Sequence, residues 1–134
     1  MKIFYTEMHR NHTPPFEVFD GGLRVPYLEN PDRMGRILNA LHAVDWADVL
    51  EPMDFGLDPI HAVHDKDYVD FLASAWTEWL DTTAQDKSTL IPATFALRRT
   101  PQKPKSLLGK AGYYIMDLSA CIVEGTYQAA LASA

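Results

Sequence analysis

The sequence predicts an α/β fold, and three of its features carry that prediction. A short segment rich in β-forming residues opens the chain at residues 2–5, and apolar residues recur at helical spacing over 32–44 and 65–80. An alanine-rich helical pattern starts at residue 126. With a further short strand expected near residue 49, the order strand, helix, strand, helix is that of the first layers of an α/β fold.

The composition is that of one globular domain. The chain has 134 residues, 47% of them apolar and 22% charged, which is enough apolar material for a single core. No charge-free apolar run approaches the roughly 20 residues of a membrane span, so no membrane partner is expected, and the N-terminus lacks the apolar stretch of a signal peptide. Because Cys121 is the single cysteine, an internal disulfide is excluded and we expect a cytoplasmic location.

The first strand is expected at Lys2 to Tyr5, where β-forming residues alternate with others. The stretch from His9 to Tyr27 contains three prolines and the pair Gly21-Gly22, which predicts a long structured loop without a regular element. Loops of this length in compact domains are usually functional.

A first helix is expected from Asp32 to Val44, with Asn30 as its cap and Pro31 at its first position. After it, the connection from Trp46 to Met53 has room for a short strand at Val49 and Leu50, and a helical turn is expected from Pro59 to Val63. These short elements join the first helix to the second.

The second helix is predicted from Asp65, its cap, to Leu80, because apolar side chains recur there at spacings of three and four. The face expected in the core consists of Tyr68, Val69, Leu72, Ala73, Trp76, Trp79 and Leu80. The last helix is expected from Thr126, with Glu124-Gly125-Thr126 as turn and cap. It reaches the end of the sequence without a Gly, Pro or basic residue to end it, so the ending looks cut.

The segment from Thr82 to Gly112 shows no sustained period and is predicted to be an inserted arm. Six of the twelve basic residues lie between Asp86 and Asp117, a stretch without an acidic residue, and the rest of the chain carries six basic against eighteen acidic residues. An acidic body disfavours nucleic acid and suits a cationic ligand. The arm itself is either a solvated loop or a segment that docks on an acidic surface of a second copy. The basic residues are Lys87, Arg98, Arg99, Lys103, Lys105 and Lys110.

Two histidine pairs, His9/His12 and His61/His64, have the spacing His-x-x-His, which metal sites use. A third ligand and an activating carboxylate at known spacing are lacking, so local hydrogen bonding is the competing interpretation of both pairs. Cys121 lies in an apolar run and is expected to be a buried, inert thiol.

Arg33 stands in the first turn of a helix, where the helix dipole disfavours a cation. A surface ion pair with Glu29 is the simplest interpretation from spacing. No complete catalytic constellation is present in the 134 residues, so the chain by itself is expected to be chemically inert.

A series of motifs follows in order along essentially the whole chain: Tyr5…His9, Glu29-x-Pro31-x-Arg33, His64-Asp65-x-x-Tyr68-Val69-x-Phe71-Leu72, Arg98-Arg99-Thr100, Gly112-Tyr113-Tyr114 and Gly125-Thr126. This series resembles the acetylpolyamine amidohydrolases of the histone deacetylase superfamily. The second and third mark the superfamily, and the Arg-Arg-Thr motif marks the polyamine branch. The resemblance covers the amino-terminal third of these enzymes.

The resemblance implies an arginase/deacetylase-like three-layer α/β fold around a parallel sheet, of which residues 1–134 would be the amino-terminal part of a single domain. It also implies a Zn²⁺ ion whose activated water attacks the carbonyl of an acetylated amine. The family's His-His pair, Asp-x-His motif and Gly-Gly-Tyr segment are absent here. The zinc ligands are therefore expected beyond this chain, which alone would be inactive as a deacetylase.

The resemblance also assigns residues to the rim and the back of the site. Arg33 matches the arginine beside the internal channel behind the zinc, and Glu17, Phe19 and Asp20 fall in a wall of the substrate mouth. Tyr113 and Asp117 are further substrate-binding candidates.

The arm over 82–111 matches an insertion that forms a homodimer and narrows the entrance to the site. Leu108 and Ser119 stand where the polyamine enzymes carry acidic residues that hold the substrate's distal ammonium, so another small acylated amine is an open alternative. An alternative function of a different class is a non-catalytic module that associates with itself through the arm.

Overall fold

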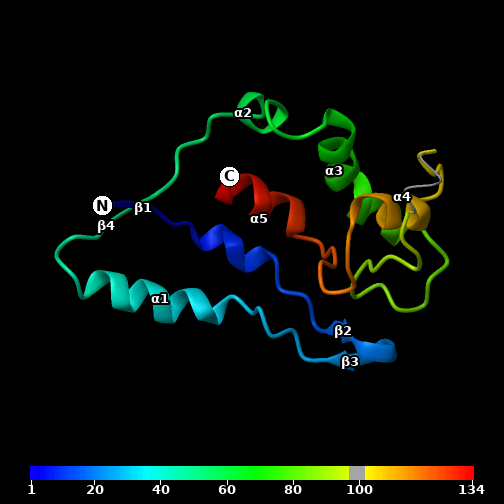
Figure 1. The fold of residues 1–134 in the computed structure, drawn as a ribbon, viewed down its shortest axis with the longest axis horizontal. Coiled ribbons are helices and arrows are strands. Elements are labelled where there is room, and N and C mark those ends of the chain that lie inside the picture. Colours follow the sequence, from blue (N-terminus) through cyan, green and yellow to red (C-terminus); the bar gives the residue numbers. More distant parts are fainter. Residues whose placement is uncertain (97–101) are drawn as a thin grey trace.

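A two-stranded parallel sheet lies at one end of the molecule, in a computed structural model that describes residues 1–96 and 102–134 (Figure 1). β1 (Lys2–Phe4) pairs with β4 (Asp48–Leu50), so that Ile3 faces Val49. The predicted strands at both places are confirmed. Parallel neighbours require a crossover, and here α1 (Asp32–His42) lies within that crossover.

The stretch predicted as a loop without regular elements contains several, so that prediction was wrong. A 3₁₀-helix, η1 (Glu7–Asn11), is followed by an antiparallel hairpin of β2 (Glu17–Phe19) and β3 (Leu23–Val25). The turn between the strands is η2 (Asp20–Gly22), in which Gly21 and Gly22 have φ values of 69° and 92°. Strands of three residues are too short for a period of two to be visible in the sequence.

Helix α1 begins two residues after Asn30, whose Oδ1 accepts a hydrogen bond from the Asp32 N–H at 3.0 Å. The predicted capping role of Asn30 is thereby confirmed, although the helix ends at His42, two residues earlier than expected. The helical turn predicted from Pro59 is α2 (Asp58–His61), with Pro59 in its first turn.

The predicted core helix is α3 (Lys66–Leu80), which begins after Asp65 without a side-chain capping bond from it. Its buried face agrees with the predicted one only in part. Val69 and Trp79 are buried as predicted, but Phe71 and Ala75 are buried as well and Leu80 is exposed. The helix turns this face toward α4 (Leu107–Tyr114), a helix that the sequence did not predict. Six of its eight residues lie in the segment 82–112, which shows no sustained period, and Ser106 caps it by accepting a hydrogen bond from the Gly109 N–H.

The core lies where α3, α4 and two short segments meet. Leu90 is fully buried and forms an antiparallel bridge with Ile122 through two backbone hydrogen bonds of 2.8 and 3.0 Å. The segment 82–111 thus contributes directly to the core, whereas its Arg98 and Arg99 lie outside the described residues. The core cluster consists of Phe71, Ala75, Trp79, Leu90, Ala111, Ile115 and Ile122.

Helix α5 (Thr126–Ser133) lies in the middle of the molecule, beside η1 and with α3 on its other side (Figure 1). It begins after Gly125, as predicted, and buries Ala129. In the described part of the chain, every helix is too short or too polar to cross a membrane.

Candidate functional site

The hairpin carries the first group of candidate residues. Glu17 is 4% exposed, and its Oε1 accepts a hydrogen bond from the Leu28 N–H at 3.0 Å. The buried carboxylate thus holds the segment that follows β3. Phe19, two residues on, is exposed at the end of β2. Asp20 opens the turn, and its side chain is outside the part that the structure describes.

The loop after α4 packs beside this hairpin. Cys121 Sγ lies 3.9 Å from the Phe16 carbonyl oxygen, and burial, with Glu17 and Asp117 adding smaller effects, raises the pKa of the thiol. The predicted burial of Cys121 is thereby confirmed, and a buried thiol with a raised pKa is a poor nucleophile. The same two carboxylates add to the burial that raises the pKa of Tyr27. We call Glu17, Tyr27, Asp117 and Cys121 the hairpin cluster.

The side chain of Asp117 is hydrogen bonded to the backbone of its own loop. Its Oδ1 accepts hydrogen bonds from the backbone N–H groups of Ser119 and Ala120 at 2.8 and 2.7 Å. This local turn fixes the carboxylate beside the hairpin. Tyr113 is the other candidate from this part of the chain; it lies near the end of α4, partly exposed, with its ring edge-on to Tyr114 at 5.0 Å.

Ion pairs join the basic arm to the rest of the chain. Lys103 Nζ lies 2.7 Å from Asp67 Oδ2 and 5.1 Å from the centre of the Tyr114 ring, whose hydroxyl donates to the same carboxylate at 2.6 Å. Lys110 pairs with Glu78 at 3.2 Å. Two lysines of the arm are thus paired with α3 of their own chain.

A second group of residues surrounds His12. Its Nδ1 lies 2.9 Å from Thr126 Oγ1, and its Nε2 lies 3.3 Å from the Tyr27 hydroxyl. Thr126 Oγ1 also accepts a hydrogen bond from the Val123 N–H. Burial lowers the pKa of His12, which favours the neutral ring. This histidine therefore connects η1 to the start of α5, a structural role.

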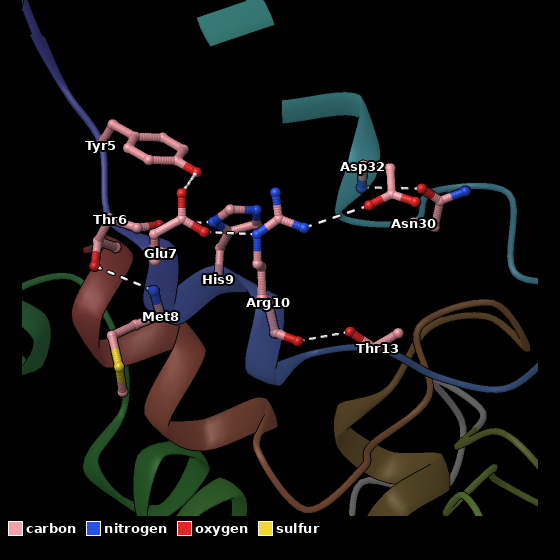
Figure 2. Close-up of polar contacts among 9 residues, drawn as sticks. All are labelled: Tyr5, Thr6, Glu7, Met8, His9, Arg10, Thr13, Asn30 and Asp32. Atoms are coloured by element: carbon pink, nitrogen blue, oxygen red, sulfur yellow. Dashed lines mark hydrogen bonds and ion pairs between the residues drawn. The ribbon is translucent and has the colours of Figure 1, made fainter. Parts of the chain in front are cut away.

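A chain of polar contacts runs from Tyr5, just after β1, to Asp32 at the start of α1, and His9 lies beside it (Figure 2). Tyr5 donates a hydrogen bond to Glu7, which pairs with Arg10 at 2.6 Å, and Arg10 reaches Asp32 at 3.3 Å. The hydrogen bond from Tyr5 is the main reason why the pKa of Glu7 is lowered. His9 Nδ1 lies 2.6 Å from the Thr6 carbonyl oxygen.

Arg33 lies apart from the hairpin cluster, at the start of α1, where it pairs with Glu29. Both side chains are more than half exposed, so the surface ion pair that spacing suggested is present. The pair borders an open cavity of about 430 Å³ that His9 and His12 also line, together with residues of α5. The structure thus brings Arg33 to the first histidine pair and leaves it separate from Glu17 and Asp117.

The described residues do not fit a zinc site. They contain no group of three or more His, Cys, Asp or Glu side chains placed to hold a metal ion. His12 is hydrogen bonded to Thr126, and His64 packs against the Tyr68 ring at 5.8 Å. His9 Nε2 and His61 Nδ1 are buried without a hydrogen-bond partner in residues 1–96 and 102–134.

Sequence reasoning missed Tyr27 and Asp67. Tyr27 joins the two groups, because its ring lies edge-on to His12 and its environment includes Glu17 and Asp117. A single tyrosine after a proline gives no sequence signal for this position. Asp67 gives only the signal of an acid in the first turn of a helix, because its partners are 36 and 47 residues away along the chain.

Comparison with curated proteins finds relatives that match the whole chain. Acetylpolyamine amidohydrolases 2 and 1 of Pseudomonas aeruginosa are each 38% identical to it over its full length, and the acetylpolyamine amidohydrolase of Mycoplana ramosa is 36% identical over 99% of it. The chain spans 38%, 39% and 38% of these three proteins. No protein-family model matches the chain.

A crystal structure of the acetylpolyamine aminohydrolase from Burkholderia pseudomallei has the same fold over this region. It superposes with a TM-score of 0.86 at 30% identity, covering 99% of the chain and 38% of the solved structure. The arginase/deacetylase-like α/β fold implied by the motifs is thereby confirmed, as is the resemblance itself.

Proposed function

We propose, for a chain related along its whole length to the acetylpolyamine amidohydrolases, that it forms part of an amidohydrolase that removes acyl groups from small amines. The observation that carries this proposal is the match of 36 to 38% identity, over 99 to 100% of the chain, to three proteins named for that activity. Because the chain spans only about 38% of such proteins, the activity is proposed for a protein that contains this region together with the rest of the fold.

The residues of this chain contribute to the shape of the substrate mouth and to the charge that a substrate meets. The hairpin presents Phe19 to solvent, and Glu17 and the loop of Asp117 hold its base. We assign the wall of the substrate mouth to this hairpin together with Asp20 and Tyr113. The net charge of −6 favours the approach of a cationic amine.

Zinc chemistry is assigned to residues outside these 134, because the described residues do not fit a metal site. Arg33, at the cavity with His9 and His12, is the residue we place beside the internal channel. We also propose a cytoplasmic location, which agrees with a single, buried, free cysteine.

A chimaera tests the activity directly. In it, this chain replaces the matched 135 residues of Pseudomonas aeruginosa acetylpolyamine amidohydrolase 2. We expect release of acetate from an acetylated diamine, lost on chelation and restored by Zn²⁺, and no release by the 134-residue chain alone. A chimaera that unfolds cooperatively but releases no acetate from any acylated amine would refute the proposal.

The choice of amine is tested at Leu108 and Ser119. Leu108 is partly exposed on α4, and Ser119 lies in the Asp117 turn. In the chimaera, Leu108→Glu and Ser119→Glu should each restore a charge-assisted hydrogen bond of about 1.5–3 kcal/mol to a distal ammonium. This corresponds to a rise of roughly 10- to 150-fold in kcat/KM for an acetylated polyamine. The uncharged variants Leu108→Gln and Ser119→Gln are the controls, and equal gains from Gln and Glu would contradict the charge argument.

We also propose that the protein forms a homodimer through residues 82–111. Lys103 and Lys110 are paired within the chain, so docking on a second copy would use the exposed Lys105 and the exposed part of α4. Lys105→Glu should then weaken the dimer in sedimentation, whereas Lys66→Glu, on the exposed first turn of α3, should not. Equal masses for both variants and the wild type would remove this role from Lys105.

A further inference from the structure

An ion pair joins the hairpin to the segment that follows α3. Arg24 Nη1, on β3, lies 3.1 Å from Asp86 Oδ2, although the two residues are 62 positions apart in the chain. Figure 1 shows the hairpin at the edge of the molecule, next to this segment. The contact therefore connects two parts that we assign to the entrance, the hairpin as a wall of the substrate mouth and the arm over 82–111.

The Arg24 side chain uses the face and the edge of its guanidinium at the same time. Its Cζ lies 4.3 Å from the centre of the Phe16 ring, just before β2, while its Nη1 donates to Asp86. A planar guanidinium can stack on a ring and donate a hydrogen bond in its own plane, which the ammonium of a lysine does not reproduce. Arg24 thus ties β3 to the residue before β2 and also to the arm.

The position of Asp86 is set by its own segment. Its Oδ1 accepts hydrogen bonds from the backbone N–H and the hydroxyl of Ser88 at 2.9 and 2.6 Å, and its Oδ2 binds Arg24. Leu90, four residues after Asp86, is fully buried and pairs with Ile122 in the core. Arg24 therefore binds a carboxylate that the core holds in place.

The outer end of the hairpin is exposed. Phe19 and Leu23 lie opposite each other beside the turn and are 45% and 64% exposed. Each strand has three residues, and a two-stranded hairpin is marginally stable by itself. Because Arg24 directly follows Leu23, its ion pair fixes the end of the hairpin that carries Phe19.

We infer that Arg24 is a positioning residue: with Asp86 it holds the hairpin against the arm, and this contact limits the size of the acylated amine that enters the mouth. The inference rests on the proposed function, since it takes the hairpin and the arm as two sides of one entrance. Both side chains are at least half exposed. An exposed ion pair with a ring contact shifts an equilibrium by roughly three- to tenfold, which changes how often the hairpin lies against the arm without deciding whether the fold forms.

Hydrogen exchange tests the contact without using activity. In the chimaera with the Pseudomonas aeruginosa relative, Arg24→Gln and Asp86→Asn should each speed exchange of the backbone amides over 17–25 by roughly threefold or more. Asp86→Asn keeps an oxygen that can accept from Ser88 and removes the charge. The double variant should exchange no faster than either single variant, because both side chains act through one contact.

The matched control for exchange is Lys66→Gln. It removes an exposed ion pair, with Asp70, that lies within α3. The exchange rates over 17–25 should be unchanged in this variant.

Substrate selectivity tests what the contact does. Arg24→Gln should lower the KM of the chimaera for acetyl-lysine within a peptide by roughly three- to tenfold and leave kcat unchanged, because the hairpin shapes only the entrance. The KM for a slender acetylated diamine should change by less than about twofold. Arg24→Lys, which keeps the charge without the stacked plane, should give an intermediate KM for the peptide. A substitution that merely destabilised the protein would lower kcat and leave the ratio of the two KM values unchanged.

The variant Asp86→Asn separates the width of the mouth from its charge. It should lower the KM for the peptide as Arg24→Gln does, although the two substitutions change the net charge in opposite directions. An effect of long-range attraction on a cationic substrate would instead have opposite signs in the two variants.

The remaining outcomes decide against the inference or against the proposed function. Exchange rates in Arg24→Gln equal to those of the unsubstituted chimaera would show that the pair does not hold the hairpin. Faster exchange with unchanged KM values would remove the contact from the control of selectivity, and opposite KM changes in the two variants would assign the effect to net charge. A chimaera that releases no acetate would refute the proposed function, while its exchange rates would still decide whether Arg24 holds the hairpin.

Discussion

The two ends of the molecule differ in how far they are packed. We call α3, α4 and residues 89–90 and 121–123 the packed end, and β1, β4, α1 and α2 the open end. The packed end contains the core cluster around the fully buried Leu90. In the open end, neither α1 nor α2 buries a residue, and Phe4 of β1 is 62% exposed.

This difference does not come from composition. Helix α1 has an amphipathic pattern and β1 has apolar residues, as the elements of the packed end do. The packed end simply contains both partners of each contact: α3 meets α4, and Leu90 meets Ile122. In the open end, α1 and α2 bury no residue, so their apolar side chains lack such partners among the described residues. A regular element thus contributes to stability only as far as its apolar face is covered.

The largest expected effect is the loss of a side chain from the packed end. Leu90→Ala should lower the free energy of unfolding by about 2–5 kcal/mol, because it leaves a cavity in the core. Phe55→Ala, at an exposed position in the connection between β4 and α2 of the open end, should change it by no more than about 0.5 kcal/mol in the 134-residue chain. Urea unfolding measures both, and equal effects would mean that the two ends are packed alike.

Two helical glycines provide a sharper contrast. A Cβ at Gly112 of α4 would lie 1.7 Å from the Thr94 carbonyl oxygen, so Gly112→Ala should destabilise by at least about 1–3 kcal/mol. At Gly35 of α1 the nearest atom, on Arg10, is 4.0 Å away, and Gly35→Ala should stabilise by about 0.5–1 kcal/mol. Thermal unfolding of the two variants compares them. A stabilised Gly112→Ala would contradict the close packing of α4.

The pH dependence of stability tests the contact between η1 and α5. Burial lowers the pKa of His12, so the unfolded chain binds a proton near pH 6.5 that the folded chain does not bind. Stability should therefore be complete above pH 6.5 and decrease as the pH falls from 6.5 toward the folded pKa. Urea midpoints between about pH 8 and pH 5 measure this. His12→Gln should flatten the slope, and His42→Gln, on the exposed side of α1, should keep it.

The smallest effect is expected at the surface ion pair of the packed end. Hydrogen bonds from Lys103 and Tyr114 lower the pKa of Asp67 below 3.8, so the charged form stabilises the fold above that pH. The contribution should be lost as the pH falls from 3.8 through the folded pKa, and it should shrink in high salt. Asp67→Asn should remove the dependence from the unfolding midpoint below about pH 4. Its persistence in this variant would assign the effect to other carboxylates.

The predictable part of the fold was the part with a local signal. Both strands of the parallel pair, the cap at Asn30 and the helices starting near residues 32, 58, 66 and 126 follow from spacing and capping residues. The hairpin and α4 do not, because three-residue strands and an eight-residue helix are shorter than the window in which a period becomes visible.

For the candidate site, the sequence located residues but not their partners. The ion pair of Arg33 with Glu29 follows from a spacing of four residues along the chain. The convergence of Glu17, Tyr27, Asp117 and Cys121 does not, since these positions come from the two ends of the chain and only folding brings them together.

The sequence by itself determined the α/β class, the buried Cys121 and, through its ordered motifs, the relationship to the acetylpolyamine amidohydrolases. Only the tertiary structure decided which face of α3 is buried, which lysines of the arm are paired within the chain and which end is left open. The physical reason is that propensity, capping and motif spacing act between neighbours along the chain, whereas burial depends on which distant segment covers each apolar face.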